Sequence, residues 1–200
     1  AAAAAASAGP IPEGNVGAGA GATVGKMLGM ERAMKGGIGA ASITLPDGVV
    51  VTALVAVNAY GDVIEPATGR VIAGVRTEDG SGLADARVLL RGGAALKQTV
   101  GQSSTIGVVA TNVTLTKTQA AKVAQMAHDG LARSITPVHS LSDGDTLFAL
   151  ATGKLAGEAD VSRIGAVAAE AVADAVLRAV RAARGLPGLP AARDLEAPPR

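Results

Sequence analysis

Two strand-like runs on either side of a turn signal set the first constraint on the fold. Residues 37–45 and 49–58 flank Pro46-Asp47-Gly48, and an Asp-Gly pair between two such runs is a strong signal for a β-hairpin. The second run is almost entirely apolar, which predicts a strand that is covered on both faces. It ends at Asn58, where polar residues follow. An Asn in that place either caps a turn or directs its amide N–H groups at a developing oxyanion.

A transition from loop to strand at Ser103-Ser104 is the second informative feature. The polar, Gly-rich segment 91–102 precedes it, and the β-branched run that begins at Ile106 favours a buried strand. If the bond before Ser104 were cut, this residue would carry a hydroxyl and an α-amine with a reference pKa of about 7.7–8.0. A hydroxyl activated by its own terminal amine is a known nucleophile. The residues alone leave open the simpler alternative, a Ser-rich loop that enters a strand.

Two segments carry the pattern of amphipathic helices. Thr116-Lys-Thr-Gln119 is a capping box, apolar residues follow at helical spacing as far as Ile135, and Pro137 ends the helix. The second helix is predicted over residues 160–183. Between the helices, residues 146–152 predict a third strand. The chain is therefore expected to form an α+β domain of packed sheets flanked by helices.

Two carboxylates precede that third strand. If residues 143–145 are extended, Asp143 and Asp145 point to the same side, and carboxylates that share a site push their pKa values apart. Such a pair can orient an N-terminal amine and pass protons. The residues alone favour a plainer interpretation, an Asp-Gly turn with solvated charges. His128, on the first helix, is interpreted as a structural hydrogen-bonding residue.

Composition excludes several classes of function. The chain has 18 basic and 17 acidic residues, one Tyr, one Phe and no Trp, so no nucleic-acid partner is expected. Without Cys and with only two His, a thiolate or His-ligated metal site is not expected either. The Gly-rich segment 13–26 fails the phosphate-loop pattern because Met27 stands where Ser or Thr is required. No secretory signal or apolar run of about 18 residues is present, so we expect a cytoplasmic protein without a membrane partner.

Several motifs occur together in the order and spacing of one family. They are Ser104-Thr-Ile-Gly-Val-Val-Ala-Thr-Asn, Leu115-Thr-Lys-Thr-Gln-Ala-Ala-Lys, Met126-Ala-His-Asp-Gly-Leu-Ala-Arg-Ser-Ile and Asp143-Gly-Asp-Thr-Leu-Phe-Ala-Leu-Ala-Thr-Gly. From about Gly14 to about Ala183, the chain resembles the DmpA-type aminopeptidases. These self-cleaving hydrolases with an N-terminal nucleophile include L-aminopeptidase/D-esterases, β-peptidyl aminopeptidases and nylon-oligomer hydrolases. The resemblance implies a four-layer α/β/β/α sandwich, partly present here, and an N-terminally truncated member.

The resemblance also implies roles for particular residues. The cut falls between Ser103 and Ser104, and Ser104 becomes the nucleophile. Asn58 matches the family's oxyanion Asn. Asp143, Asp145 and Lys26 match the paired aspartates and the lysine of the nylon-hydrolase branch. No metal or organic cofactor is implied.

One departure leaves the register of the cut open. Relatives usually have Asn or Gly before the nucleophile, whereas this chain has Ser103, so a cut before Ser103 or Thr105 remains an alternative.

The sequence thus predicts three regions and one function. Residues 1–103 form the α-subunit region with a loose linker over 64–102, residues 104–184 form the β-subunit region, and residues 185–200 form a disordered tail. The predicted function is a self-processing serine/threonine-type amide hydrolase, aminopeptidase-like, that acts on small peptides, amides or esters as a homo-oligomer. The alternative is a catalytically inactive fragment that serves as a structural or interaction module.

Overall fold

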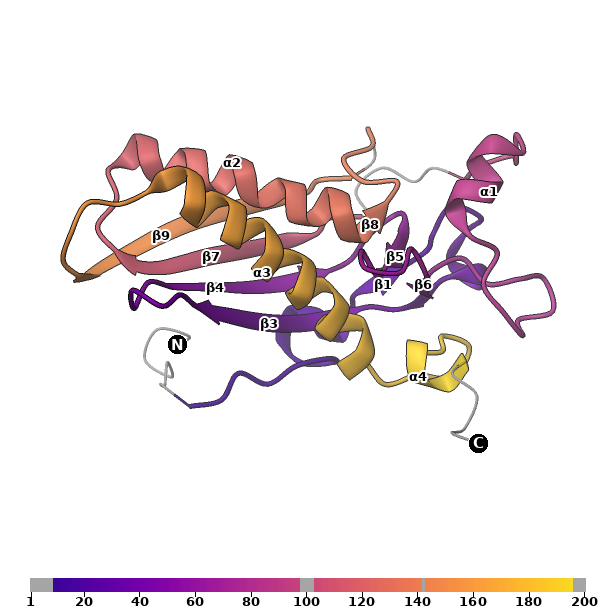
Figure 1. The fold of residues 1–200 in the computed structure, drawn as a ribbon. Helices are drawn as coiled ribbons and strands as arrows, with labels where there is room; N and C mark the ends of the chain where they lie inside the picture. Colours follow the sequence, from indigo (N-terminus) through magenta and orange to yellow (C-terminus); the bar gives the residue numbers. More distant parts are fainter. Residues whose placement is uncertain (1–8, 98–102, 142, 196–200) are drawn as a thin grey trace.

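A four-stranded sheet is the main layer of the computed structural model, which describes residues 9–97, 103–141 and 143–195 (Figure 1). The strand order is β3 (Gly37–Thr44), β4 (Val50–Val57), β7 (Ile106–Val113) and β9 (Thr146–Leu155). The pairs β3–β4 and β4–β7 are antiparallel, whereas β7 and β9 are parallel. The hairpin predicted from the Asp-Gly turn is confirmed, with Thr44 opposite Val50.

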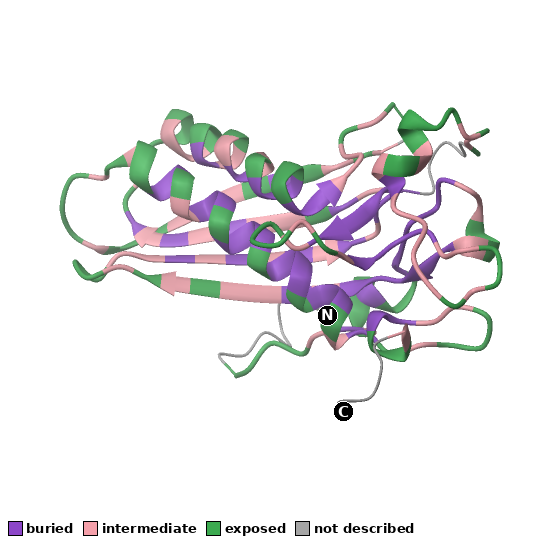
Figure 2. Ribbon diagram, turned by 45° about the vertical axis from the view of Figure 1, so that its right-hand side comes forward, coloured by how far each residue is buried: buried purple, intermediate pink, exposed green. Residues whose placement is uncertain are grey.

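Two helices cover one face of this sheet, α2 (Lys117–Ser134) and α3 (Val161–Ala182) (Figures 1 and 2). The predicted capping box of α2 is confirmed: Thr116 Oγ1 accepts from Gln119 N at 3.2 Å, and Gln119 Oε1 accepts from Thr116 N at 2.8 Å. Apolar side chains of α3 pack into the main core against β3 and β4. This burial of apolar surface is the main stabilising contribution of the layer.

Glycines allow these layers to approach closely. A Cβ built on Gly39 of β3 would lie 2.1 Å from the carbonyl oxygen of Ala175 in α3. A Cβ on Gly130 of α2 would lie 2.3 Å from the carbonyl oxygen of Ala169. Both distances are far inside van der Waals contact, so α3 rests directly on β3 and on α2 only because these positions lack a side chain.

The opposite face of the sheet is apolar and open among the described residues. Alternate residues of β4 point away from the helices, and a shallow groove of about 250 Å³ lies there. Its lining residues are Ala18, Ile38, Leu54, Ala56, Ile106, Gly107, Val108 and Phe148. Phe148 is 65% exposed. The sequence predicted that both faces of β4 are covered; within the described part of the chain, the helices cover one.

Smaller elements form the rest of the molecule. A three-stranded sheet has the order β6 (Val71–Ala73), β5 (Asp62–Ile64) and β8 (Ile135–Thr136), and a two-stranded sheet pairs β1 (Thr23–Val24) with β2 (Met34–Lys35). The short helices are the 3-10 turns η2 (Gly17–Ala20) and η3 (Met30–Arg32), α1 (Ala86–Arg91) and α4 (Ala192–Leu195).

The segment predicted as mostly loop contains part of β5 together with β6 and α1. The buried carboxylate of Asp62 holds this segment in place, because it accepts from the backbone N–H of Val75 at 2.8 Å and of Ala86 at 2.7 Å. Contacts of this kind join residues far apart in sequence, so local composition does not reveal them.

The C-terminal segment also differs from the prediction. Residues 185–195 were expected to be disordered, but Ala191 and Ala192 are buried and the backbone N–H of Lys35 donates to the Pro190 carbonyl at 2.8 Å. This segment packs against β2, which is far from it in sequence. The Pro- and Ala-rich composition of the segment therefore does not reveal the contact. Residues 196–200 lie outside the described residues. No helix in the described ranges is long and apolar enough to cross a membrane.

Candidate active site

The residues singled out from the sequence converge where β4 ends and where β7 and β9 begin. Ala56 of β4 lies opposite Ile106 of β7, and Ile106 lies beside Thr146 of β9. This register brings the segments that follow β4 and precede β7 and β9 to one edge of the sheet (Figure 1). Ser103 and Asp143 pair there in an isolated parallel bridge.

Lys26 is a buried cation at this edge. Its residue is 5% exposed, and Nζ donates to Asn58 Oδ1 at 2.7 Å, to Thr23 Oγ1 at 3.1 Å and to the Thr23 carbonyl at 3.3 Å. Burial lowers its pKa to about 8, although the charges of Asp143 and Asp145 act in the opposite direction. The ammonium therefore loses its proton more readily than a solvated lysine.

Asn58 is held by both its side chain and its backbone. Its Oδ1 accepts from Lys26 Nζ and also from the backbone N and Oγ1 of Thr23, at 3.1 and 3.3 Å. These donors fix the oxygen end of the amide, so Nδ2 points the other way. The Asn58 carbonyl accepts from the backbone N of Ser104 at 2.8 Å.

The peptide unit between Ser103 and Ser104 sits inside this arrangement. Its carbonyl oxygen accepts from the backbone N of Gly144 at 2.9 Å and from Ser104 Oγ at 2.7 Å. Ser103 is buried and Ser104 is half-buried. A Cβ on Gly144 would lie 2.5 Å from Ser104 Oγ, so the glycine leaves room for that hydroxyl.

The neighbouring hydroxyl of Thr105 has different surroundings. Thr105 is 0% exposed, and its Oγ1 has no hydrogen-bond partner among the described residues. Of Ser104 and Thr105, Ser104 is the one whose hydroxyl contacts the carbonyl on its N-terminal side.

The two aspartates accept hydrogen bonds from backbone N–H groups, whereas the backbone N of Ser104 donates to the Asn58 carbonyl. Asp145 Oδ1 accepts from the backbone N of Thr105 at 2.8 Å. Asp143 accepts from the backbone N of Tyr60 at 3.2 Å and from Ser140 Oγ at 2.7 Å. Each carboxylate thus ties the loop before β9 to a neighbouring segment.

Lys35 is a further buried cation that the sequence analysis missed. It is 0% exposed, and its Nζ donates to the carbonyls of Gly19 and Ala22, both at 2.7 Å, and of Gly36 at 3.1 Å. It shapes the Gly-rich segment that leads into Thr23 and Lys26. Nothing in the local sequence marks this lysine, because all three acceptors are backbone groups.

Sequence reasoning also missed Thr23, Tyr60 and His139. Thr23 could have been noticed three residues before Lys26. Tyr60 is buried, and burial together with the charge of Asp143 raises the pKa of its hydroxyl. His139 contacts Asp145, and only the folded loop reveals that contact.

A polar cleft of about 210 Å³ opens onto this site. Its lining residues are Lys26, Gly29, Met30, Glu31, Tyr60, Lys97 and Ser103. An ion pair of Glu31 with Lys97 stands at the cleft, with both side chains more than half exposed. Within residues 9–97, 103–141 and 143–195, no group of three or more His, Cys, Asp or Glu side chains is placed to hold a metal ion.

Comparison with known proteins identifies the family. The model of Peptidase family S58 matches residues 1–193, and the chain belongs to this family. An uncharacterized aminopeptidase from Mycobacterium leprae (strain TN) is 40% identical over 194 residues, which cover 90% of this chain and 52% of the relative. A 6-aminohexanoate-oligomer endohydrolase from Paenarthrobacter ureafaciens is 33% identical over 186 residues, covering 86% of this chain and 51% of that enzyme.

Solved structures agree with this assignment. A beta-aminopeptidase from Burkholderia sp. superposes with a TM-score of 0.64 at 29% identity, over 92% of this chain and 51% of that one. The L-aminopeptidase D-Ala-esterase/amidase from Ochrobactrum anthropi, a variant of the Ntn hydrolase fold, gives a TM-score of 0.60 at 23% identity, over 92% and 49%. This second likeness concerns the fold alone. The chain spans about half the length of the curated relatives it matches.

Proposed function

We propose that this chain carries the self-processing centre of an amide hydrolase that cuts the bond before Ser104. The observation that supports this most directly is the environment of the Ser103 carbonyl. Its oxygen accepts the backbone N–H of Gly144 at 2.9 Å and the Ser104 hydroxyl at 2.7 Å. A carbonyl held by a backbone donor beside a hydroxyl group is suited to nucleophilic attack, because the donor stabilises the negative charge that develops on oxygen.

In the first reaction, Ser104 Oγ bonds to the carbonyl carbon of Ser103 and the carbon–nitrogen bond breaks. The hydroxyl proton passes to the Ser104 nitrogen, which leaves an ester and a free α-amine. Water then cleaves the ester, so Ser103 ends in a carboxylate and Ser104 regains its hydroxyl. The new amine starts beside the Asn58 carbonyl, to which the Ser104 nitrogen already donates at 2.8 Å.

In the second reaction, mature Ser104 attacks the carbonyl of a substrate amide. Its α-amine takes the hydroxyl proton and delivers it to the leaving amine, and water frees the acyl group. Asn58 Nδ2 stabilises the oxyanion, and Lys26 stabilises negative charge in the cleft. Asp143 and Asp145 orient the N-terminal residue by holding the backbone around it. This scheme uses no metal or organic cofactor.

The proposal includes the domain division and the complete fold. The cut separates residues 1–103 from residues 104–184, but β4 and β7 remain paired in one sheet, so the two pieces stay associated. The open apolar face of that sheet would pack against a second sheet from the rest of the protein, giving a four-layer α/β/β/α sandwich. Assembly into a homo-oligomer and a cytoplasmic location remain predictions.

Small peptides and amides are the proposed substrates. The relatives are named as an aminopeptidase, a beta-aminopeptidase and a 6-aminohexanoate-oligomer endohydrolase, and all three names describe cleavage of amide bonds. The cleft of about 210 Å³ carries both lysine and glutamate side chains, which suits a small polar substrate.

Intact mass of the full-length protein tests the proposal. We expect two fragments under denaturing conditions, the second beginning at Ser104, and one associated species under native conditions. The variant Ser104→Ala should stay uncut and inactive. Ser103→Ala and Thr105→Val are the matched controls, because each removes a neighbouring hydroxyl and should leave processing intact. A single uncut mass for the unaltered protein, stable over days, would instead support an inactive structural or interaction module.

A further inference from the structure

The loop between α2 and β9 places a histidine against the outer side of Asp145. His139 Nδ1 lies 3.0 Å from Asp145 Oδ2, and the backbone N of His139 donates to the same oxygen at 3.3 Å. The other oxygen, Oδ1, accepts from the backbone N of Thr105 at 2.8 Å. The carboxylate is thus held on one side by the residue that follows the proposed nucleophile and on the other by His139.

A second imidazole continues this chain of contacts. His128 Nδ1 of α2 lies 3.3 Å from His139 Nε2, and the two ring centres are 4.9 Å apart. When His139 is neutral and donates through Nδ1, its Nε2 is an acceptor, so His128 must supply the proton between the two rings. The hydrogen bond at one ring nitrogen selects the tautomer at the other. An Nδ1–H on His128 and the carboxylate of Asp145 therefore favour the same form of His139, the one that donates to Asp145.

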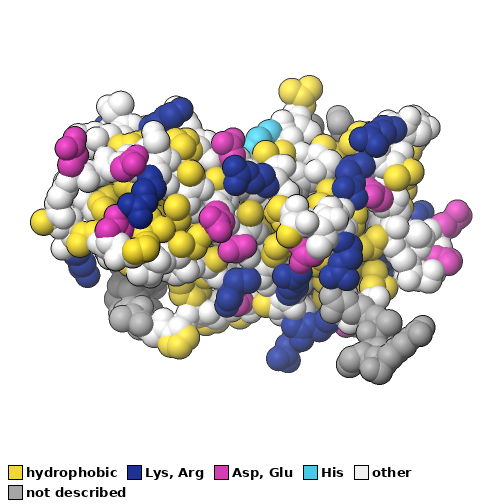
Figure 3. All heavy atoms as spheres, viewed as in Figure 1, with side chains coloured by type: hydrophobic (Ala, Val, Ile, Leu, Met, Phe, Trp, Pro, Cys, Tyr) yellow, Lys and Arg dark blue, Asp and Glu magenta, His cyan; other side chains and the backbone are white. Residues whose placement is uncertain are grey.

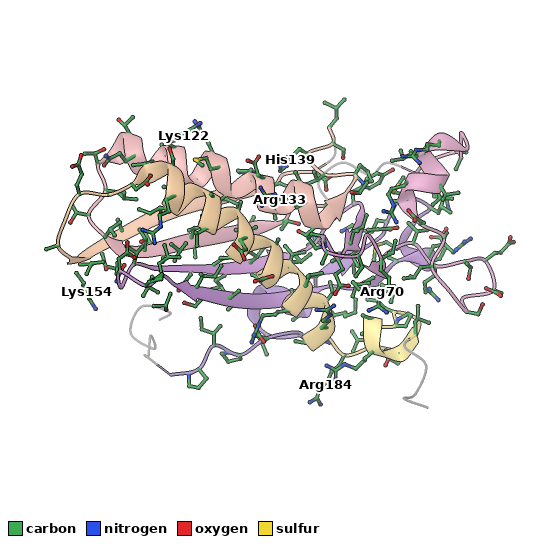
Figure 4. The ribbon with its side chains drawn as sticks, in the orientation of Figure 1. Arg70, Lys122, Arg133, His139, Lys154 and Arg184 are labelled. Carbon is green, nitrogen blue, oxygen red and sulfur yellow. The ribbon has the colours of Figure 1, made fainter. Side chains whose placement is uncertain are left out.

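Exposure decreases from the imidazoles toward the carboxylate. The side chain of His139 is 39% exposed, whereas that of Asp145 is 3% exposed. Histidine atoms reach the molecular surface in Figure 3, and Figure 4 labels His139 in the loop above the sheet. Hydrogen bonds to a charged group in such a sheltered place are stronger than bonds in water.

Burial disfavours a positive charge on His128. Burial lowers the pKa of His128, and the charge of His139 lowers it further, while Asp145 and Asp129 act in the opposite direction.

The backbone of His139 supports a specific role for this residue. Its φ is 54°, in the left-handed region that most side chains avoid. Asn and Gly adopt this conformation more readily than other residues. Histidine is one of the few non-glycine residues found repeatedly in this conformation, and here it places the backbone N and Nδ1 of His139 on the same oxygen of Asp145.

We propose that His139 is a positioning residue for Asp145 and that His128 fixes the tautomer of His139. The chain of contacts Asp145–His139–His128 would hold the carboxylate in the orientation that supports the backbone next to Ser104. This inference rests on the proposed function, since it assigns His139 a task only if Asp145 serves the nucleophile. Neither histidine contacts the reacting atoms in this scheme.

Three variants of the full-length protein test the inference. His139→Gly removes the imidazole and tolerates the backbone conformation, so kcat should fall about tenfold or more with KM little changed. His139→Asn tolerates the same conformation and keeps an N–H donor, so kcat should stay within about threefold of the unaltered protein. His128→Leu should give an intermediate loss, because it removes the partner that selects the tautomer. Equal kcat and KM in His139→Gly and the unaltered protein would overturn the inference.

A second measurement does not depend on activity. Nitrogen NMR of histidine-labelled protein in the Ser104→Ala background should show His139 protonated at Nδ1 at about pH 8, and His128→Leu should lose this single-tautomer signature. A His139 protonated at Nε2 would also overturn the inference. The two proposals fail separately: absence of processing in the unaltered protein refutes the proposed function, whereas normal processing with an indifferent His139→Gly refutes only the role of His139.

Discussion

Replacement of Lys26 by Met should change how the stability of this protein depends on pH. The lysine is buried beside Thr23 and Asn58, and its pKa in the folded state is about 8 compared with an ordinary value of 10.5. Between these two values the unfolded chain binds more protons than the folded chain. The free energy of unfolding therefore rises with pH across this window, as the folded state ceases to bury a charge.

The size of the effect follows from the two pKa values. Proton linkage with pKa values of about 8 and 10.5 gives an increase in the free energy of unfolding of about 2.5 kcal/mol between about pH 7 and pH 10. Lys26→Met removes this increase, and Asn58 Oδ1 still accepts two hydrogen bonds from Thr23. The advantage of the Met variant over the lysine protein should therefore shrink by about 2.5 kcal/mol over that range.

Urea denaturation at a series of pH values measures this difference. Both proteins should carry Ser104→Ala, so that self-cleavage cannot alter the reference state. Lys122→Met is the matched control, because Lys122 is exposed on the outer side of α2 (Figure 4) and its replacement is the same chemical change at a solvated position. Titration of groups distant from Lys26 is common to both proteins and cancels to first order. Parallel stability curves for Lys26→Met and its parent would refute the reasoning.

Three further predictions concern the fold. Burial raises the pKa of Asp62 from 3.8 to about 6, so the folded state binds this proton more tightly than the unfolded state. Relative to Asp62→Asn, the free energy of unfolding of the unaltered protein, measured by urea denaturation, should increase by about 2 kcal/mol as the pH falls from 7 to 4. A difference between the two proteins that does not change with pH would contradict this. Gly39→Ala should lower the stability of the protein by about 1–3 kcal/mol, because the added Cβ would meet the carbonyl oxygen of Ala175. Gly21→Ala is the control, since Gly21 has open space around it and its replacement should change the melting temperature little. Equal melting shifts in the two variants would argue against the close approach of α3 to β3. Thr116→Ala should cost about 1 kcal/mol through the lost capping box, measured by urea denaturation, with the solvent-facing Lys117→Ala as control.

Local patterns allowed much of the secondary structure to be predicted from the sequence. The hairpin followed from the Asp-Gly turn, the start of α2 from Thr116 and Gln119, and α3 from apolar residues at helical spacing. Each of these signals lies within a few residues of the element it specifies, because hydrogen bonds in helices and tight turns join near neighbours. The order of the motifs also indicated the family, which the match over residues 1–193 establishes.

The candidate site residues could be named from the sequence, but most of their contacts could not. Lys26 contacts the side chain of Asn58, and the carbonyl of Asn58 accepts from the backbone N of Ser104; the catalytic roles of these residues stay predictions. The two aspartates bind the backbone of Thr105 and Tyr60, and this detail depends on the register between β7 and β9. Strands β7 and β9 are parallel and joined through α2, so no tight turn between them specifies their register.

What the sequence determined by itself was therefore the set of elements and the chemistry available to them. Only the tertiary structure decided which groups are buried together: Lys35 with three carbonyls, Asp62 with two backbone N–H groups, and His139 with Asp145. The same holds for residues 185–195, whose contact with Lys35 overrides a composition typical of disorder. The physical reason is that a buried polar group must find partners wherever the packed chain provides them, and these partners are set by the packing of whole layers.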